Sequence, residues 1–193
     1  MKHCLFWILC LWTALPLTAQ KFAVSTNLLD WANLGTVNLQ AGISASRHLT
    51  LHAGIRYNPW QYGSAEKGRV FQNKARTASV GARLWPWNVY SSWWFGLNLQ
   101  CEEYRRGGLI AEKTEEGRAG GLGFAAGYSR MLSGHWNFDV GLGFWVGAAR
   151  YTQYRCPRCG RTLTFADGTP IRNAWKGFIW PSNDVRIGLT YVF

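Results

Sequence analysis

Charged side chains are scarce in this sequence. Only 16% of its 193 residues are Asp, Glu, Lys or Arg, whereas another 16% are aromatic and 22 residues are glycine. A soluble domain usually covers its surface with more charge than this. The excess of aromatic residues and glycine over charge therefore favours β-structure that faces something other than water.

Long apolar runs are absent after residue 19, which excludes a transmembrane helix, because such a helix needs about 18 uninterrupted apolar residues. The apolar run at 4–17 follows a basic residue, Lys2, and precedes the small residues Thr18 and Ala19. This arrangement is typical of a secretory signal peptide. We therefore expect a signal peptide over residues 1–19 and a single domain over residues 20–193.

Cysteine is too sparse for a disulfide framework. Beyond the expected signal peptide only Cys101, Cys156 and Cys159 remain, and an odd number leaves one thiol over. The Cys156-x-x-Cys159 spacing favours a disulfide that tightens a loop, and it could also supply two of the four ligands of a zinc site. His48 and His135 are expected in turns on the opposite side, so we expect no bound metal and no cofactor.

Apolar and polar residues alternate with a period of two nearly everywhere after residue 21. Eight segments follow this pattern, at 22–28, 37–44, 49–57, 79–84, 93–102, 121–129, 136–147 and 185–193. Short connections at 45–49, 85–91 and 131–135 alternate with longer ones at 59–73, 104–117 and 151–182. The pattern predicts an all-β fold, an antiparallel up-and-down transmembrane β-barrel of about eight strands.

Two environments are compatible with this alternation. In a soluble ligand-binding barrel the apolar side chains would line a cavity, whereas in a membrane barrel they would face lipid. The other side chains are mainly Gly, Ser, Asn and Thr, which suit a narrow lumen better than a soluble surface. Charged residues of this polar set are expected to form an ion-paired lumen network: His52, Arg56, Arg83, Glu102, Asp139 and Arg186.

Aromatic residues near the strand ends favour the membrane interpretation, because membrane barrels carry aromatic girdles at both interfaces. The expected girdle residues are Tyr57, Trp60, Trp85, Trp87, Trp93, Tyr128 and Trp136. An outer-membrane location is therefore the expectation for this chain.

Basic residues are in excess, with a formal net charge of +11, and many fall in the longer connections. The residues expected to form a basic patch on the outer side are Arg105, Arg106, Arg150, Arg155, Arg158, Arg161, Arg172 and Lys176. Arginine forks suit bidentate contact with phosphate, so outer-membrane lipid and lipopolysaccharide phosphates are the expected partners. Nucleic acid is not expected as the partner of an exported protein.

The last segment, with Tyr191 and the terminal Phe193, resembles the C-terminal signal that the barrel-assembly machinery reads. The sequence also resembles DUF3575, a Bacteroidetes family of exported barrels. The resemblance rests on the motifs at 25–29, 57–60, 134–136 and 154–160 together with the terminal segment. It implies an outer-membrane barrel without established activity, and it suggests a role beside fimbrial or other surface proteins.

Three functions follow as hypotheses. The first is a non-enzymatic barrel that serves as a surface anchor or as an accessory of envelope or fimbria assembly. The second is a lipid-acting outer-membrane enzyme, which would need a Ser, a His and an acid within reach of one another. No histidine falls in the expected outer loops, which disfavours this enzyme. The third is a soluble secreted barrel that binds a hydrophobic ligand in its cavity.

Overall fold

The computed structural model describes residues 22–33, 35–62, 71–107, 113–155, 162–181 and 185–193. Its strands are β1 Phe22–Asn27, β2 Val37–Ser44, β3 Leu49–Asn58, β4 Gln61–Tyr62, β5 Phe71–Leu84, β6 Ser92–Gly107, β7 Thr114–Met131, β8 Trp136–Tyr154, β9 Ala174–Pro181 and β10 Arg186–Val192. One short helix, α2, covers Leu28–Ala32. No helix among the described residues is long and apolar enough to span a membrane.

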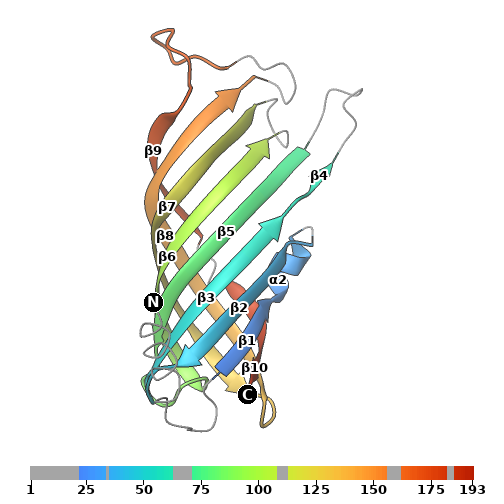
Figure 1. Cartoon of the computed structure of the whole chain (residues 1–193), viewed down its shortest axis with the longest axis vertical. Helices are drawn as coiled ribbons and strands as arrows, with labels where there is room; N and C mark the ends of the chain where they lie inside the picture. Colours follow the sequence, from blue (N-terminus) through green and yellow to red (C-terminus); the bar gives the residue numbers. More distant parts are fainter. Residues whose placement is uncertain (1–21, 34, 63–70, 108–112, 156–161, 182–184) are drawn as a thin grey trace, which may run out of the picture.

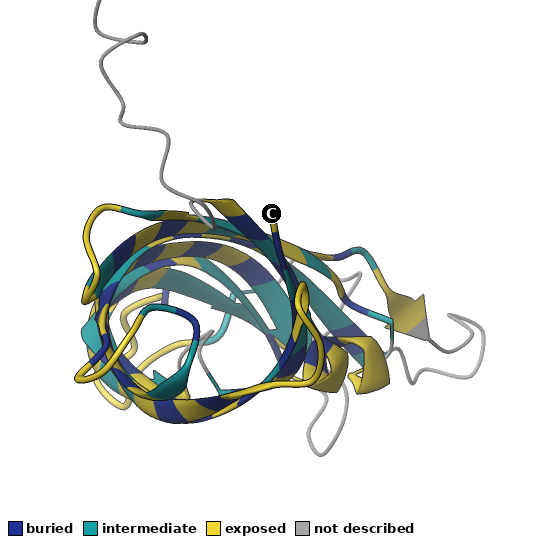
Figure 2. Ribbon diagram, turned by 90° about the horizontal axis from the view of Figure 1, so that it is seen from below, coloured by how far each residue is buried: buried dark blue, intermediate teal, exposed yellow. Residues whose placement is uncertain are grey.

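The strands form one closed antiparallel barrel, in which sequence neighbours pair and β10 closes the ring between β8 and β1 (Figures 1 and 2). Strand β4 continues the pairing of β3 along β5, so the two together form one stave, as we call each of the eight strand positions around the barrel. Strands β9 and β10 pair with the upper and lower parts of β8 and together form the last stave. The predicted up-and-down barrel of eight strands is therefore confirmed.

Side chains alternate between the two faces of the wall, as the banded ribbon in Figure 2 shows. Along β6, buried and exposed residues alternate without a break from Trp93 to Tyr104. The exposed set is the apolar one, with Leu142 at 74% and Ile179 at 73% exposure. We call its large members the apolar belt: Leu39, Ile43, Leu51, Ile55, Val80, Leu84, Phe95, Leu97, Leu99, Leu122, Phe124, Val140, Leu142, Phe144, Ile179 and Ile187.

The strands that begin or end at the long connections extend further than expected. Strand β5 begins at Phe71, β7 begins at Thr114 and β8 continues to Tyr154. The connection expected at 104–117 therefore shrinks to the residues between Gly107 and Thr114. These extensions could not be recognised in the sequence, because the outward positions there carry charged instead of apolar side chains. The alternation of apolar residues therefore stops before the strand ends.

The opposite side of the wall is lower, because β1 ends early. The segment expected to extend the first strand to Leu28 turns into α2, whose N-cap Asn27 accepts a hydrogen bond from the backbone N–H of Leu29 at 3.2 Å. Strand β9 pairs with β8, and none of the described residues pairs with its second edge. The wall is thus tall from β5 to β9 and low at β1, β2 and β10 (Figure 1).

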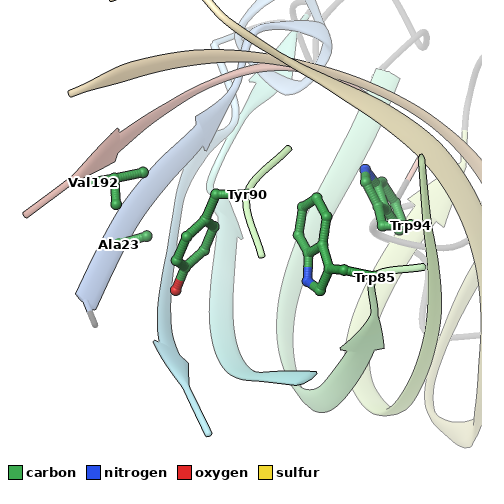
Figure 3. Close-up of a cluster of buried hydrophobic side chains, with 5 residues drawn as sticks. All are labelled: Ala23, Trp85, Tyr90, Trp94 and Val192. Atoms are coloured by element: carbon green, nitrogen blue, oxygen red, sulfur yellow. The ribbon is translucent and has the colours of Figure 1, made fainter. Parts of the chain in front are cut away.

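An aromatic cluster fills the lower end of the lumen, where the tight turns and the C-terminus lie (Figures 1 and 3). We call it the lower plug: Ala23, Trp85, Tyr90, Trp94 and Val192. Trp85 is only 2% exposed and donates from Nε1 to Thr50 Oγ1 at 3.0 Å. Its expected place in the interfacial girdle is therefore wrong, because the 85–91 turn folds into the lumen and carries Trp85 and Tyr90 with it.

Candidate functional site: the filled lumen and the outer charged row

The lower lumen is organised around the amide of Gln40. Its Oε1 accepts hydrogen bonds from Arg83 at 3.0 Å and from Arg186 at 2.5 Å. Arg186 also lies 3.6 Å from the carboxylate of Asp139, with both side chains almost fully buried, and Asp139 accepts a hydrogen bond from Thr190. An uncharged residue thus holds two arginines side by side in the narrow space, and one carboxylate balances part of their charge.

The upper lumen has two further ion pairs. Helix α2 places Asp30 inside the barrel, where it lies 2.9 Å from Arg56. Glu102 on β6 binds Arg106, which lies four residues further along the same strand. All six residues of the predicted lumen network therefore lie on the inward face, but Asp30, Gln40 and Arg106 complete it.

Aromatic residues and a second acid–base cluster line the inward face of β6 to β9. Glu115 accepts hydrogen bonds from Lys176, from Gln153 at 2.9 Å and from the hydroxyl of Tyr104 at 2.7 Å. The rings of Trp145, Phe178 and Trp180 pack against one another and against Tyr104. Lys176 and Arg106 each lie over the Trp180 ring, at 5.9 and 5.1 Å from its centroid.

The interior leaves little room. Two hollows in the lumen hold about 20 and 30 Å³, each enough for about one or two water molecules. His52 lines the lower one together with Arg83 and Trp85. The histidines of the lower turns, His48 and His135, contact backbone carbonyls of Trp85 and Val192 at 3.0 and 2.9 Å.

The structure separates the residues expected in one basic patch. Arg106 and Lys176 lie in strands and face the lumen, where Glu102 and Glu115 bind them. Arg105 and Arg150 also lie in strands, but on the outward face. Exposed Arg155 and Arg172 lie beyond the end of β8 and before β9. Four expected residues, Cys156, Arg158, Cys159 and Arg161, lie outside the described residues.

An outward row of charged residues crosses the tall wall instead. Successive strand pairings align Tyr57, Arg76, Glu103, Arg118, Arg150 and Trp175, which we call the outer charged row. A groove of about 740 Å³ runs along this face, lined by five of these residues and by Lys74, Arg105, Glu116 and Thr152 of the next row above. Sequence reasoning missed Arg76 and Arg118; the signal was their parity, which matches that of the apolar positions in β5 and β7.

The C-terminal residues pack at the lower rim. Tyr191 contacts the rings of Trp136 and Phe193, with centroids 5.1 and 4.8 Å apart. Phe193 donates its backbone N–H to Phe22 across the closing seam of the barrel at 2.9 Å. Within the described part of the chain, no cluster of three or more His, Cys, Asp or Glu could hold a metal ion, and Cys101 is a free thiol on the outward face.

Fold and interior together define a closed, eight-stranded antiparallel β-barrel protein with side chains filling its lumen. Residues 5–171 match the model of the family described as "Protein of unknown function (DUF3575)", so the chain belongs to that family, as its motifs indicate. Among curated proteins and solved structures, none matches the chain at a significant level.

Proposed function

We propose that this chain is a non-enzymatic outer-membrane β-barrel that serves as an anchor or accessory at the cell surface. The apolar belt carries the proposal. Its side chains are exposed around the wall, which is costly in water but favourable against lipid. On β6 the apolar alternation from Trp93 to Cys101 has about the 9–11 residues that a tilted strand needs to cross a bilayer.

Aromatic pairs at the lower ends of the strands support the same placement. Trp93 packs on Tyr128 with a centroid distance of 5.3 Å, and Trp136 packs on Tyr191. Amphipathic rings favour the membrane–water interface, so these pairs would form the inner girdle. With the C-terminus at this end, the tight turns would face the periplasm and the tall wall would extend outward.

The filled interior supports a structural role. The hollows of about 20 and 30 Å³ in the described part of the lumen are too small for a hydrophobic ligand of ordinary size, which argues against the soluble ligand-binding barrel. Charged side chains in the lumen form ion pairs with one another, as in Asp30–Arg56 and Asp139–Arg186. Export by a cleaved signal peptide and insertion by the barrel-assembly machinery belong to the same proposal.

Fractionation and gel mobility test the proposal together. We expect the full chain, expressed in a bacterium with an outer membrane, to be recovered in the outer-membrane fraction with its mature N-terminus at Gln20. Unboiled protein should run differently from boiled protein, because a closed barrel resists detergent until it is heated. Recovery as a soluble periplasmic or secreted protein would contradict the proposal.

A further inference from the structure

The outward face of the tall wall changes character sharply along each strand. Two residues below the outer charged row, the paired positions carry small or apolar side chains, which we call the small-residue row: Ile55, Ala78, Cys101, Gly120, Ala148 and Gly177. The next row down consists of Ala53, Val80, Leu99, Leu122, Val146 and Ile179. Under the proposed function, the charged row therefore lies where acyl chains give way to headgroups.

Positive charge dominates the groove at this level. Five cations line it against two carboxylates, Glu103 and Glu116. Glu103 is bound by Arg118 at 3.1 Å, and Glu116 lies 3.7 Å from Arg105 and accepts a hydrogen bond from Tyr154 at 2.6 Å.

Three of the five cations in the groove do not belong to these two ion pairs. Among the described residues, Lys74, Arg76 and Arg150 have no carboxylate within ion-pair distance. These three cations are therefore available to an anion from outside the chain.

The positions of Arg118 and Arg150 favour the binding of such an anion. They are directly opposite each other on β7 and β8, and both are exposed. Like charges directly opposite on neighbouring strands destabilise a sheet, and an anion bound between them would offset this repulsion. Guanidinium groups form paired hydrogen bonds with phosphate oxygens, so phosphate is the anion that suits this pair best.

The surroundings of the pair fit a lipid. Trp175, 70% exposed, follows Arg150 in the same row, and an exposed indole favours the headgroup region. Directly below, Gly120, Ala148 and Gly177 leave space against the wall for the upper part of a lipid.

We propose that the outer charged row binds the phosphate groups of an outer-leaflet glycolipid, lipopolysaccharide in an outer membrane, with Arg118 and Arg150 as the principal contacts and Arg76 as a further one. This site rests on the proposed function, because only the outer leaflet brings such a lipid to this height.

The test uses the mature chain folded in detergent micelles, with binding followed by native mass spectrometry. The probes are lipid A with its phosphates, the same lipid after enzymatic dephosphorylation, and inorganic phosphate. We expect phosphorylated lipid A to bind at least about tenfold more tightly than the dephosphorylated form, as charge-assisted hydrogen bonds imply. Equal binding of the two lipids would overturn the site, and so would competition by inorganic phosphate at the lipid's own concentration.

A variant pair locates the site. Arg118→Gln/Arg150→Gln should lose about tenfold in affinity for phosphorylated lipid A, since it removes two charged donors. The matched control, Arg47→Gln/Arg130→Gln, removes the same charge from exposed arginines toward the lower end and should change the affinity less than twofold. An equal loss in both variants would mean general charge attraction and would contradict the site.

Two further measurements separate the possible failures. If the double variant does not fold, Arg76→Gln alone should still weaken binding, and the comparison of lipids on the wild-type chain needs no variant. Insertion into vesicles, with a mobility shift on boiling, is recorded for every sample. A wild-type chain that fails to insert refutes the proposed function, whereas one that inserts but does not discriminate phosphate refutes only the lipid site.

Discussion

The lower and upper parts of the barrel wall carry opposite kinds of side chain on their outward faces. In the lower part, the outward side chains are apolar, and the lumen is closed by eight staves around the lower plug and Gln40. In the upper part, β5 to β9 continue as a tall sheet whose outward face carries the outer charged row. The alternation of inward and outward side chains continues across this boundary, so it indicates where the strands run. The chemistry of the outward side chains indicates what surrounds each part of the wall.

The lower and upper parts of the lumen also differ, in how their cations are paired. Below, Arg83 and Arg186 share one amide, and their charge is held inside a space with almost no free volume. Above, each cation has its own acid, as in Arg106–Glu102 and Lys176–Glu115. The lower network is therefore the part that a single substitution should damage most.

The largest effect is expected from Asp139→Ala. The substitution leaves Arg186 buried without its carboxylate, and removing one partner of a buried ion pair costs about 3–5 kcal/mol of unfolding free energy. Reversible urea unfolding in lipid vesicles measures it. Asp167→Ala, which removes a carboxylate from an exposed loop, is the control and should change stability little; similar costs for both would argue against a coupled lower network.

A charge in the apolar belt should cost somewhat less. Leu97→Arg places a guanidinium near the middle of β6, where lipid contact predicts a loss of about 2–4 kcal/mol in the same unfolding experiment. Thr152→Arg introduces the same charge on the outward face of the groove and should be nearly neutral. If Leu97→Arg were also neutral, the belt would be facing water.

Packing behind the belt predicts a smaller loss. A Cβ atom at Gly127 would lie 2.4 Å from both Trp94 Cζ2 and the carbonyl oxygen of Val140, so Gly127→Ala must displace the lower plug. Overpacking of this kind costs about 1–3 kcal/mol. Gly134→Ala, where nothing lies within 4 Å, should leave the unfolding midpoint unchanged, and a midpoint unaffected by both variants would show that Trp94 has room to move.

The smallest effect belongs to the exposed ion pair of the outer charged row. The side chains of Arg118 and Glu103 are 82% and 55% exposed, so Glu103→Gln should change the unfolding free energy by less than about 1 kcal/mol. A cost comparable to that of Asp139→Ala would mean that the upper wall is as tightly coupled as the lower lumen.

Much of the architecture was predictable because a two-residue period leaves little freedom. The parity of Trp136 to Val146 fixed which residues point outward, and the short connections fixed the antiparallel order. The membrane environment, the signal peptide and the roles of the basic residues remain predictions, as does the pairing of Cys156 with Cys159.

Other features could not be read from the sequence for identifiable reasons. Leu28 and Leu29 fit a strand as well as a helix, and only the cap at Asn27 decides for α2. Trp85 looked like an interfacial residue because a turn gives no parity to assign. Gln40 carries no charge, so nothing marked it as the acceptor for two buried arginines.

The most direct test of the account is the depth of the apolar belt. A single cysteine at Leu142, with the native cysteines replaced by serine, is labelled with a fluorophore after the barrel folds into vesicles. Phe165→Cys, at an exposed position between β8 and β9, serves as the matched control. Lipids brominated along their acyl chains should quench the label at 142 strongly and the label at 165 hardly at all. Equal, weak quenching at both positions would contradict a lipid-facing belt and with it the proposed function.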